Sequence, residues 1–255
     1  MLSFRPFAPA LLALALAFAP QAASAQNFSD TQRGDIEKIV RDYIVKHPEV
    51  LEEAMNELSK RQATADAEKH QVSIAQNSEA IFNSPRGVQL GNKDGDVTFV
   101  EFFDYNCGYC KRAMTDMMEL MKADPKLKVV LKEFPVLSAG SVEAAQVGVA
   151  VRMQDPSGKK YLDFHQKLLG GRGAADKARA MAVAKEVGLD MAKLEKDLSS
   201  AEVRSTLEEN FKLAEAMGMN GTPSYVIGKQ VVIGAVGVDN LKEKIGIARC
   251  GKATC

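Results

Sequence analysis

The sequence predicts an α/β fold that carries an inserted helical subdomain and is preceded by an N-terminal helical arm. Three observations support this prediction. A strand, a helix and a second strand follow one another between residues 97 and 134. A long stretch rich in Ala, Lys, Glu and Leu, from about 139 to 217, has no strand signal. Two short strands and a closing helix end the chain, so the element order is βαβ, helices, ββα.

Residues 1–25 have the features of a signal peptide. Arg5 supplies positive charge, residues 7–18 are nearly all apolar, and Ala23-Ser24-Ala25 forms a small-residue cleavage site. The apolar run is too short to span ~30 Å of hydrocarbon, which argues against the alternative of an uncleaved membrane anchor. We therefore expect an exported protein whose mature chain begins near Gln26.

Residues 26–78 are expected to form an N-terminal helical segment. Its apolar residues recur at intervals of three and four, as on one face of a helix. They are Ile36, Ile39, Val40, Tyr43, Ile44, Leu51, Met55 and Leu58. Pro48 predicts two helices, or one kinked helix, that meet near His47. So narrow a stripe must be buried against copies of itself, which would make the arm an oligomerisation segment, or against its own domain.

The domain proper is expected to occupy residues 79–255 and to begin with a βαβ unit. Residues 97–103 are β-branched and aromatic and follow a turn-like segment, and residues 127–134 form a second strand. Residues 108–122 between them form a helix with a methionine-rich apolar face. This order implies parallel strands joined by a right-handed crossover.

The helical insertion at about 139–217 should be interrupted where glycines break the pattern, at Gly170-Gly171 and at Gly188. Past the insertion, residues 224–233 form a tight hairpin of two short strands. Residues 238–248 close the chain as a helix.

The charges and the cysteines limit the function classes. The chain carries 33 basic and 33 acidic residues, so no net field draws it to nucleic acid or to an anionic membrane. Its four cysteines fall into two close pairs, 107/110 and 250/255. Disulfides persist in exported proteins, but a fold stapled by them would need more cysteines in fewer residues. Each pair is therefore expected to serve a local purpose.

Cys107 and Cys110 stand at the start of a predicted helix, separated by Gly108 and Tyr109. At this spacing the pair can switch between dithiol and disulfide without a large backbone movement. The helix N-terminus stabilises a thiolate on the first cysteine. Cys107 is thus predicted to attack a client disulfide, and the more buried Cys110 to resolve the mixed disulfide.

Two other interpretations of this pair are a zinc half-site and an inert disulfide. Zinc would need two further Cys or His ligands. The candidates are His47, His70, His165, Cys250 and Cys255. None of them forms a recognisable second half, so no metal is expected. The strand-to-helix position within a βαβ unit favours a reactive pair over an inert one.

Gly221-Thr222-Pro223 leads from the end of a predicted helix into a strand. The Thr222–Pro223 bond could be cis, which would expose the edge of these residues for a peptide strand to pair with. The alternative is an ordinary turn. Thr-Pro alone is a weak signal, and its combination with the Cys-x-x-Cys pair is a strong one.

With these residues the chain resembles the exported bacterial Dsb-type thiol-disulfide interchange proteins, which have a thioredoxin-like fold with a helical insertion. The segments 102–110 (FFDYNCGYC) and 221–223 carry the resemblance. It implies that Cys107 is an exposed nucleophile and that Thr222 and the cis-proline Pro223 lie beside the thiols. Glu101 falls where oxidases of the family tend to hold a buried acid that assists proton transfer. The alternative is a strand residue that faces solvent.

The resemblance also implies a direction of exchange. The dipeptide Gly108-Tyr109 and a Thr before the proline are similar to the isomerase branch. The helical arm is similar to that of the suppressor-of-copper-sensitivity C proteins, some of which are oligomeric isomerases. The implied protein is a periplasmic homo-oligomer without a cofactor that acts on unfolded or misoxidised exported proteins and is reset by a membrane redox partner. The alternatives are a monomeric disulfide oxidase and a non-catalytic protein of this fold that binds copper or acts as a chaperone.

Cys250 and Cys255 lie just past the last predicted helix. In an exported chain they are expected to form a small structural disulfide that pins the C-terminus. A second redox relay and a soft-metal site are the alternatives.

Overall fold

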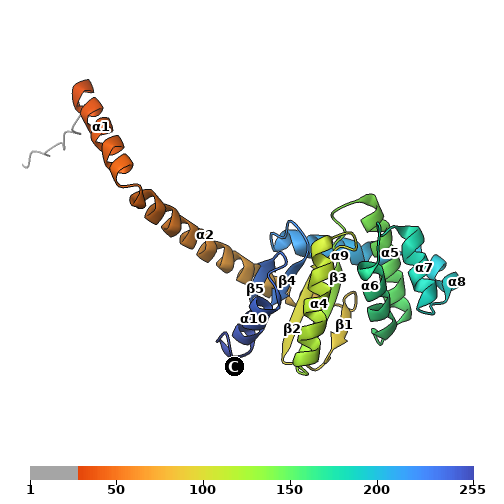
Figure 1. Ribbon diagram of the computed structural model, residues 1–255. Coiled ribbons are helices and arrows are strands. Elements are labelled where there is room, and N and C mark those ends of the chain that lie inside the picture. Colours follow the sequence, from red (N-terminus) through yellow and green to blue (C-terminus); the bar gives the residue numbers. More distant parts are fainter. Residues whose placement is uncertain (1–27) are drawn as a thin grey trace, which may run out of the picture. The chain divides into compact units, whose positions relative to one another are not determined.

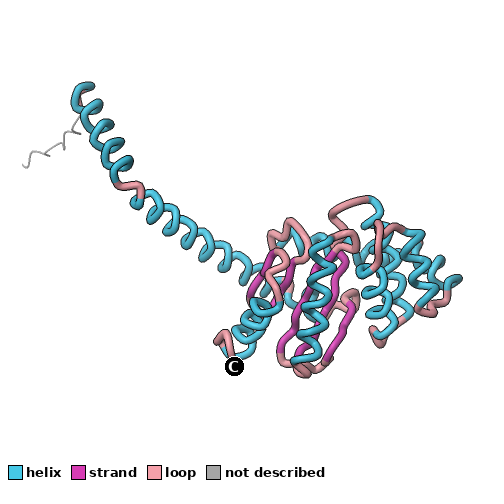
Figure 2. Tube along the Cα trace, in the orientation of Figure 1, coloured by secondary structure: helices cyan, strands magenta, loops and turns pink. Residues whose placement is uncertain are grey.

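The computed structural model describes residues 28–255, so the predicted signal peptide lies outside the described residues. The chain forms two compact units, one that ends at Leu58 and one that extends from Ser59 to Cys255. The first unit contains helix α1 (Asp30–Lys46) and the beginning of helix α2 (Glu49–Gln76). The second unit contains the rest of α2 and the α/β domain, whose helices and strands are shown in Figures 1 and 2.

Helices α1 and α2 meet at His47-Pro48, as the proline predicted. Ser29 caps α1, since its hydroxyl accepts a hydrogen bond from the Gln32 backbone N–H while the Gln32 side chain accepts one from the Ser29 N–H. No residue of α1 is buried in the single chain. Seven residues of the predicted stripe are exposed, with accessible fractions that run from 42% at Ile36 to 71% at Met55, and Ile44 is partly buried.

Helix α2 continues as one helix through most of the stretch 61–78 that follows the stripe. Its C-terminal turns pack on the domain, where Ile74 is buried and the Ser73 hydroxyl donates a hydrogen bond to the Ala216 carbonyl at 2.6 Å. The short helix α3 (Ser78–Phe82) follows. These contacts attach the end of α2 to the domain, and the compact unit therefore starts earlier in the chain than residue 79.

A five-stranded mixed sheet forms the centre of the domain, in the order β1-β3-β2-β4-β5. The strands are β1 (Val88–Gly91), β2 (Val97–Phe103), β3 (Leu127–Glu133), β4 (Ser224–Ile227) and β5 (Gln230–Ile233). β2 and β3 are parallel and are joined through α4 (Gly108–Ala123), whereas the other neighbours are antiparallel. β1 was not predicted, because a segment of four residues that ends in glycine is too short to show the alternation typical of a strand. Its pairing with β3 identifies it as a strand.

Helices cover both faces of the sheet. On one face α4 and α10 (Val238–Cys250) bury apolar side chains such as Met117 and Leu241, and on the other α3 and α9 bury Ile81 and Leu213. The insertion consists of α5 (Ala139–Gln154), α6 (Lys159–Gly170), α7 (Lys177–Glu186), α8 (Met191–Leu198) and α9 (Ala201–Ala216). Of these, α5 to α8 lie together beside the sheet in Figure 1. Among residues 28–255, no helix is long and apolar enough to cross a membrane.

A buried polar cluster joins the insertion to the sheet. Glu133, at the end of β3, accepts a hydrogen bond from the Tyr161 hydroxyl at 2.5 Å, and the Tyr105 hydroxyl lies 3.4 Å from that of Tyr161. Burial raises the pKa of Glu133. His165, one of the zinc candidates, is buried among aromatic rings, and burial lowers its pKa to about 3. The cluster holds α6 against β3 and against the segment before the redox cysteines.

Gly148→Ala is expected to lower the free energy of unfolding by about 1–3 kcal/mol. A Cβ at this position of α5 would lie 3.1 Å from the Tyr105 hydroxyl and 3.2 Å from Glu133 Oε1. Both groups belong to the buried cluster and cannot move without weakening its hydrogen bonds. Denaturant unfolding measures the change. Gly170→Ala is the matched control, because a Cβ there meets only Met114 Cε, at 3.8 Å. Equal stability of the Gly148 variant and the wild type would show that α5 can move aside.

Candidate active site

The two redox cysteines lie where strand β2 leads into helix α4. Cys107 is the N-cap residue of α4 with an extended backbone (φ −84°, ψ 114°), and Cys110 lies in the first turn. Cys107 is 6% exposed and Cys110 is 0% exposed. Cys110 is therefore the more buried of the two, but the expected exposure of Cys107 is wrong for this state of the protein. The loop that precedes β4 contacts Cys107 and removes it from solvent.

That loop contains the cis peptide bond Thr222–Pro223. In the thiol form Cys107 Sγ donates a hydrogen bond to the Thr222 carbonyl at 3.2 Å. The Ser224 hydroxyl donates to the Gly221 carbonyl at 2.7 Å and β4 begins at Ser224, so the loop is anchored where it enters the sheet. β4 pairs with β2, and this pairing brings the loop next to the start of α4.

The site stabilises a thiolate on Cys107 and not on Cys110. The pKa of Cys107 is lowered to about 5, chiefly because the Cys110 thiol donates a hydrogen bond to the thiolate. The Thr222 side chain and the backbone N–H groups of Tyr109 and Cys110 lower it further, against the opposing effect of burial. Burial raises the pKa of Cys110 far above that of a free thiol, and the nearby Cys107 and Glu101 raise it further.

Glu101 is buried in β2, with 2% of its surface exposed, and does not face solvent. Burial raises the pKa of its carboxyl to about 8, with smaller contributions from Asp116 and Cys107. Tyr225 lies directly opposite Glu101 in the antiparallel pairing of β2 with β4, so the two side chains share a face of the sheet. At neutral pH the Glu101 carboxyl is therefore largely protonated.

The dipeptide between the cysteines lies at the surface. Tyr109 is 59% exposed, and the Arg112 guanidinium lies over its ring at 4.9 Å from the centroid. A Cβ added to Gly108 would meet no atom within 4 Å. The dipeptide itself is therefore free of covering atoms at Gly108, and Tyr109 offers an exposed aromatic surface between the two buried cysteines.

Two residues of the site were missed in the sequence, Asp104 and Asn106. Asp104 is buried, and its carboxylate accepts hydrogen bonds from the backbone N–H groups of Val136, Leu137 and Asn106 at 2.9, 3.0 and 2.8 Å. The Asn106 side chain bonds to the insertion. An Asp and an Asn just before a helix indicate turn chemistry, but their partners lie far away in the chain.

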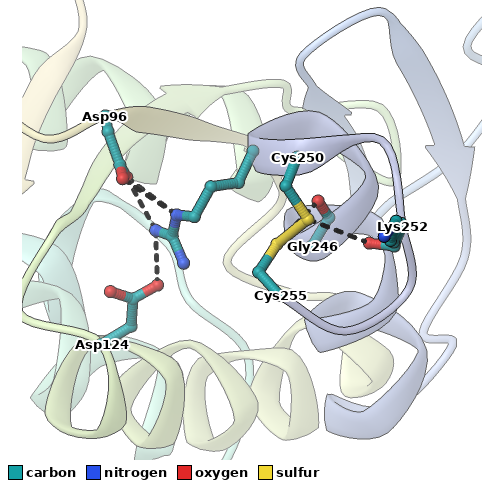
Figure 3. Close-up of a disulfide and its surroundings, with 7 residues drawn as sticks. Asp96, Asp124, Gly246, Cys250, Lys252 and Cys255 are labelled. Atoms are coloured by element: carbon teal, nitrogen blue, oxygen red, sulfur yellow. Dashed lines mark hydrogen bonds and ion pairs between the residues drawn. A yellow bond between two sulfur atoms is a disulfide. The ribbon is translucent and has the colours of Figure 1, made fainter.

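Cys250 and Cys255 form a disulfide at the C-terminus, which Figure 3 shows together with Asp96 and Asp124. Arg249, next to Cys250 in the chain, forms ion pairs with both of these carboxylates. Asp96 precedes β2 and Asp124 follows α4, so this disulfide lies at the end of the sheet opposite to the redox pair. Strand β2, of seven residues, separates the two ends by roughly 20 Å. The placement suits a structural staple better than a relay to the redox pair.

Replacing Cys250 and Cys255 by Ser together is expected to lower the free energy of unfolding by on the order of 2 kcal/mol, because the disulfide closes a short loop. The exchange activity of the redox pair should stay at the wild-type level. Thermal unfolding and a disulfide exchange assay of the double variant measure the two quantities. A large loss of exchange with unchanged stability would instead support a redox relay.

Comparisons with known proteins agree with this geometry. Residues 98–246 match the DSBA-like thioredoxin domain, and residues 32–65 match the copper resistance protein ScsC N-terminal domain. The structure of a thioredoxin-like oxidoreductase from Silicibacter pomeroyi DSS-3 is 42% identical and covers 67% of this chain and 96% of its own, with a TM-score of 0.64. A linker-deletion mutant of Proteus mirabilis ScsC is 28% identical and covers 88% of this chain and 98% of its own, with a TM-score of 0.65.

Curated relatives extend the comparison. Disulfide bond formation protein D of Bacillus subtilis (strain 168) is 29% identical over 171 residues, which cover 61% of this chain and 74% of that protein. The chain also matches Na(+)/H(+) antiporter NhaA 1 of Salinispora arenicola (strain CNS-205) at 22% identity, but spans only 24% of its length. The family match covers more than half of the chain and includes both redox cysteines and the cis-proline loop. The chain therefore belongs to the DSBA-like thioredoxin family of thiol-disulfide oxidoreductases, and it is similar to ScsC.

Proposed function

We propose that the protein exchanges disulfides in exported polypeptides of the periplasm, and that it works chiefly as an isomerase or reductase. The observation that carries this proposal is the stabilised Cys107 thiolate beside the Thr222–Pro223 loop. With a pKa of about 5, Cys107 is ionised at neutral pH in the dithiol form. This is the state that attacks a wrong disulfide.

The reaction begins when the Cys107 thiolate attacks one sulfur of a client disulfide. A bond forms between Cys107 and that sulfur, and the second client sulfur leaves as a thiolate. A client thiolate can then attack the mixed disulfide, which creates a new client disulfide and restores the Cys107 thiolate. Alternatively Cys110 loses its proton and attacks Cys107, which closes the 107/110 disulfide and releases a reduced client.

The environment of Cys110 favours the first of these outcomes. Burial disfavours the Cys110 thiolate, so resolution by Cys110 is slow. A slow internal resolution gives a second client thiol time to attack. A membrane reductase that returns the 107/110 disulfide to the dithiol would then keep the protein in its isomerase form.

The exposed stripe of the N-terminal helices supports assembly into a homo-oligomer. Ile39 and Tyr43 of α1 are 67% and 54% exposed in the single chain, and Met55 of α2 is 71% exposed. Such a stripe is stabilised when copies of the arm pack together. The match of residues 32–65 to the ScsC N-terminal domain supports the same interpretation. Several thiol sites would then surround one client.

A comparison of two substrates tests the direction of exchange. The mature protein, kept as the dithiol, should restore activity to a client with scrambled disulfides. The 107/110 disulfide form should oxidise a reduced client poorly. Rapid oxidation without any recovery of the scrambled client would favour the monomeric oxidase.

The copper-binding alternative has its own test. The α4 methionines Met114, Met118 and Met121 pack against the core, which accounts for their spacing without a metal. If neither client reacts while Cys107→Ala abolishes copper(I) binding, the protein is a metal-binding relative of this fold and not an exchange enzyme.

Ile39→Asp is expected to convert the wild-type oligomer into a monomer, because a charge on the stripe cannot be buried between helices. The variant should lose recovery of the scrambled client but keep the reaction of Cys107 with a small disulfide. Val45→Asp is the matched control, since Val45 is 71% exposed on α1 and lies off the predicted stripe. Light scattering at micromolar concentration measures the mass. A wild-type protein that is already monomeric would remove the main support for the isomerase.

A further inference from the structure

We infer that Asn106 is a positioning residue of the thiol site, through which the loop between α6 and α7 holds Cys107 over the start of α4. This inference rests on the proposed exchange function of Cys107. Asn106 directly precedes Cys107 in the chain. Although Cys107 lies outside the helical insertion, the insertion would then influence the chemistry of its thiol.

The Asn106 side chain is bonded entirely to the insertion. Its amide nitrogen donates to the Ala175 carbonyl at 2.8 Å and to the Ser141 hydroxyl at 3.0 Å. Its amide oxygen accepts from the Ala175 backbone N–H at 2.7 Å. Ala175 and Ser141 are both buried. Two opposed bonds to one backbone residue orient the amide plane, and the third bond to α5 prevents it from swinging away.

The same loop is fastened on the other side of the redox pair by Lys111. The Lys111 ammonium group donates to the Gly170 carbonyl at 2.8 Å and to the Gly171 carbonyl at 3.3 Å, at the C-terminal end of α6. A cation at this position satisfies carbonyls that the helix leaves without partners. Residues 170–175 are thus attached both before Cys107 and after Cys110.

The hydrogen bonds of the Asn106 side chain restrain the backbone that leads into Cys107. The Asn106 N–H is held by Asp104 Oδ1 at 2.8 Å, and the Cys107 N–H donates to the Asp104 carbonyl at 3.0 Å. Fixing the Asn106 side chain therefore fixes the peptide unit that leads into the N-cap. Cys107 Sγ is thereby kept over the first N–H groups of α4, which stabilise its thiolate.

Loss of the Asn106 amide should release this peptide unit and weaken the thiolate. A less stable thiolate makes the dithiol form less favourable, so the equilibrium with glutathione moves toward the 107/110 disulfide. A merely structural role would have another signature. Stability would fall, whereas the ionisation of Cys107 and its equilibrium with glutathione would not change.

The test compares Asn106→Ala with the wild type in the full mature chain. Thiolate absorbance against pH measures the ionisation of Cys107, and equilibration with reduced and oxidised glutathione measures the redox constant. We expect a shift of about tenfold toward the disulfide and a matching rise in the Cys107 pKa of about one unit. Ser141→Ala, which leaves Asn106 in place and removes one of its partners, should shift both quantities in the same direction by less.

Asn92→Ala is the matched control. Asn92 also fastens a loop with its side chain, since its amide donates to the Pro125 carbonyl and accepts from the Asp94 N–H, both at 3.0 Å. It precedes β2 and so lies at the end of the sheet away from the thiols. This variant should lose stability without any redox shift.

The inference is overturned if Asn106→Ala unfolds more easily but keeps the wild-type thiolate titration and glutathione equilibrium. If that variant does not fold, an unshifted Ser141→Ala variant overturns it instead. These results are distinct from a failure of the proposed function, which would show as a wild-type protein whose 107/110 pair does not equilibrate with glutathione at all.

Discussion

Cys107→Ser will reduce disulfide exchange to the background rate, whereas Cys110→Ser will keep the first attack and accumulate a mixed disulfide. The reason is the unequal electrostatic environment of the two sulfurs. The Cys107 thiolate is stabilised by hydrogen bonds from Cys110, from Thr222 and from the start of α4, and a serine hydroxyl has no comparable anion at neutral pH. Cys110 only resolves the mixed disulfide, so its loss blocks the later step.

Mass spectrometry under non-reducing conditions, after reaction with a disulfide-bonded peptide, distinguishes the two variants. The Cys110→Ser protein should carry the mass of one bound peptide, and the Cys107→Ser protein should carry none. Each variant replaces one sulfur by one oxygen, so they control for each other, and thermal unfolding of the reduced proteins checks that both are folded. A peptide adduct on the Cys107→Ser protein would assign the nucleophile to another cysteine.

Glu101→Gln will raise the free energy of unfolding at pH 7 by on the order of 3 kcal/mol. Folding raises the pKa of this carboxyl from 4.5 to about 8, mainly by burial. The contribution of such a group is fully present below pH 4.5 and is lost as the pH rises through about 8, because the unfolded chain ionises first. A glutamine does not titrate, so the gain of the variant should be absent at pH 4 and should grow up to about pH 8.

The measurement is best made on the 107/110 disulfide form. In the reduced form the lowered pKa of Cys107 has the opposite effect, since its contribution to stability is lost as the pH falls through about 5 and is complete only above about 9. Glu119→Gln serves as the control, because Glu119 pairs with Lys242 at the surface and should change stability little. A Glu101→Gln curve parallel to that of the wild type between pH 4 and 8 would contradict the buried, protonated carboxyl.

The same variant also tests the proposed proton transfer. If the ionised form of Glu101, which is the minor form at pH 7, accepts the proton of Cys110 during resolution, Glu101→Gln should slow the closure of the 107/110 disulfide and leave the first attack by Cys107 unchanged. Single-turnover kinetics with a peptide disulfide separate the two steps. If the variant and the wild type close the 107/110 disulfide at the same rate, Glu101 affects the stability of the protein but takes no part in the proton transfer.

Local patterns predicted most of the domain. The alternation and the β-branched residues of 97–103 identified β2, the glycine between two short apolar runs identified the hairpin of β4 and β5, and the glycines at 170 and 188 marked the ends of helices. These signals are local because strand propensity, turn conformation and helix termination each depend on residues that are neighbours in the sequence.

Two elements depended on tertiary contacts. β1 has four residues and becomes a strand because β3 offers it a free edge, a property that no local pattern records. The end of α2 belongs to the compact domain because Ile74 is buried there and Ser73 bonds to Ala216, far along the chain. A helical pattern shows that some face is buried but does not name the surface that covers it.

The sequence by itself determined the redox chemistry, because the spacing of Cys107 and Cys110 and their place at a helix start set which sulfur can form a thiolate. Only the tertiary structure decided how that thiolate is held. Thr222 approaches Cys107, Glu101 is buried rather than solvated, and Asn106 bonds to Ala175 of the insertion. Burial and hydrogen-bond partners between residues so far apart depend on how the sheet and the insertion pack, and that packing is not encoded in the spacing of any single segment.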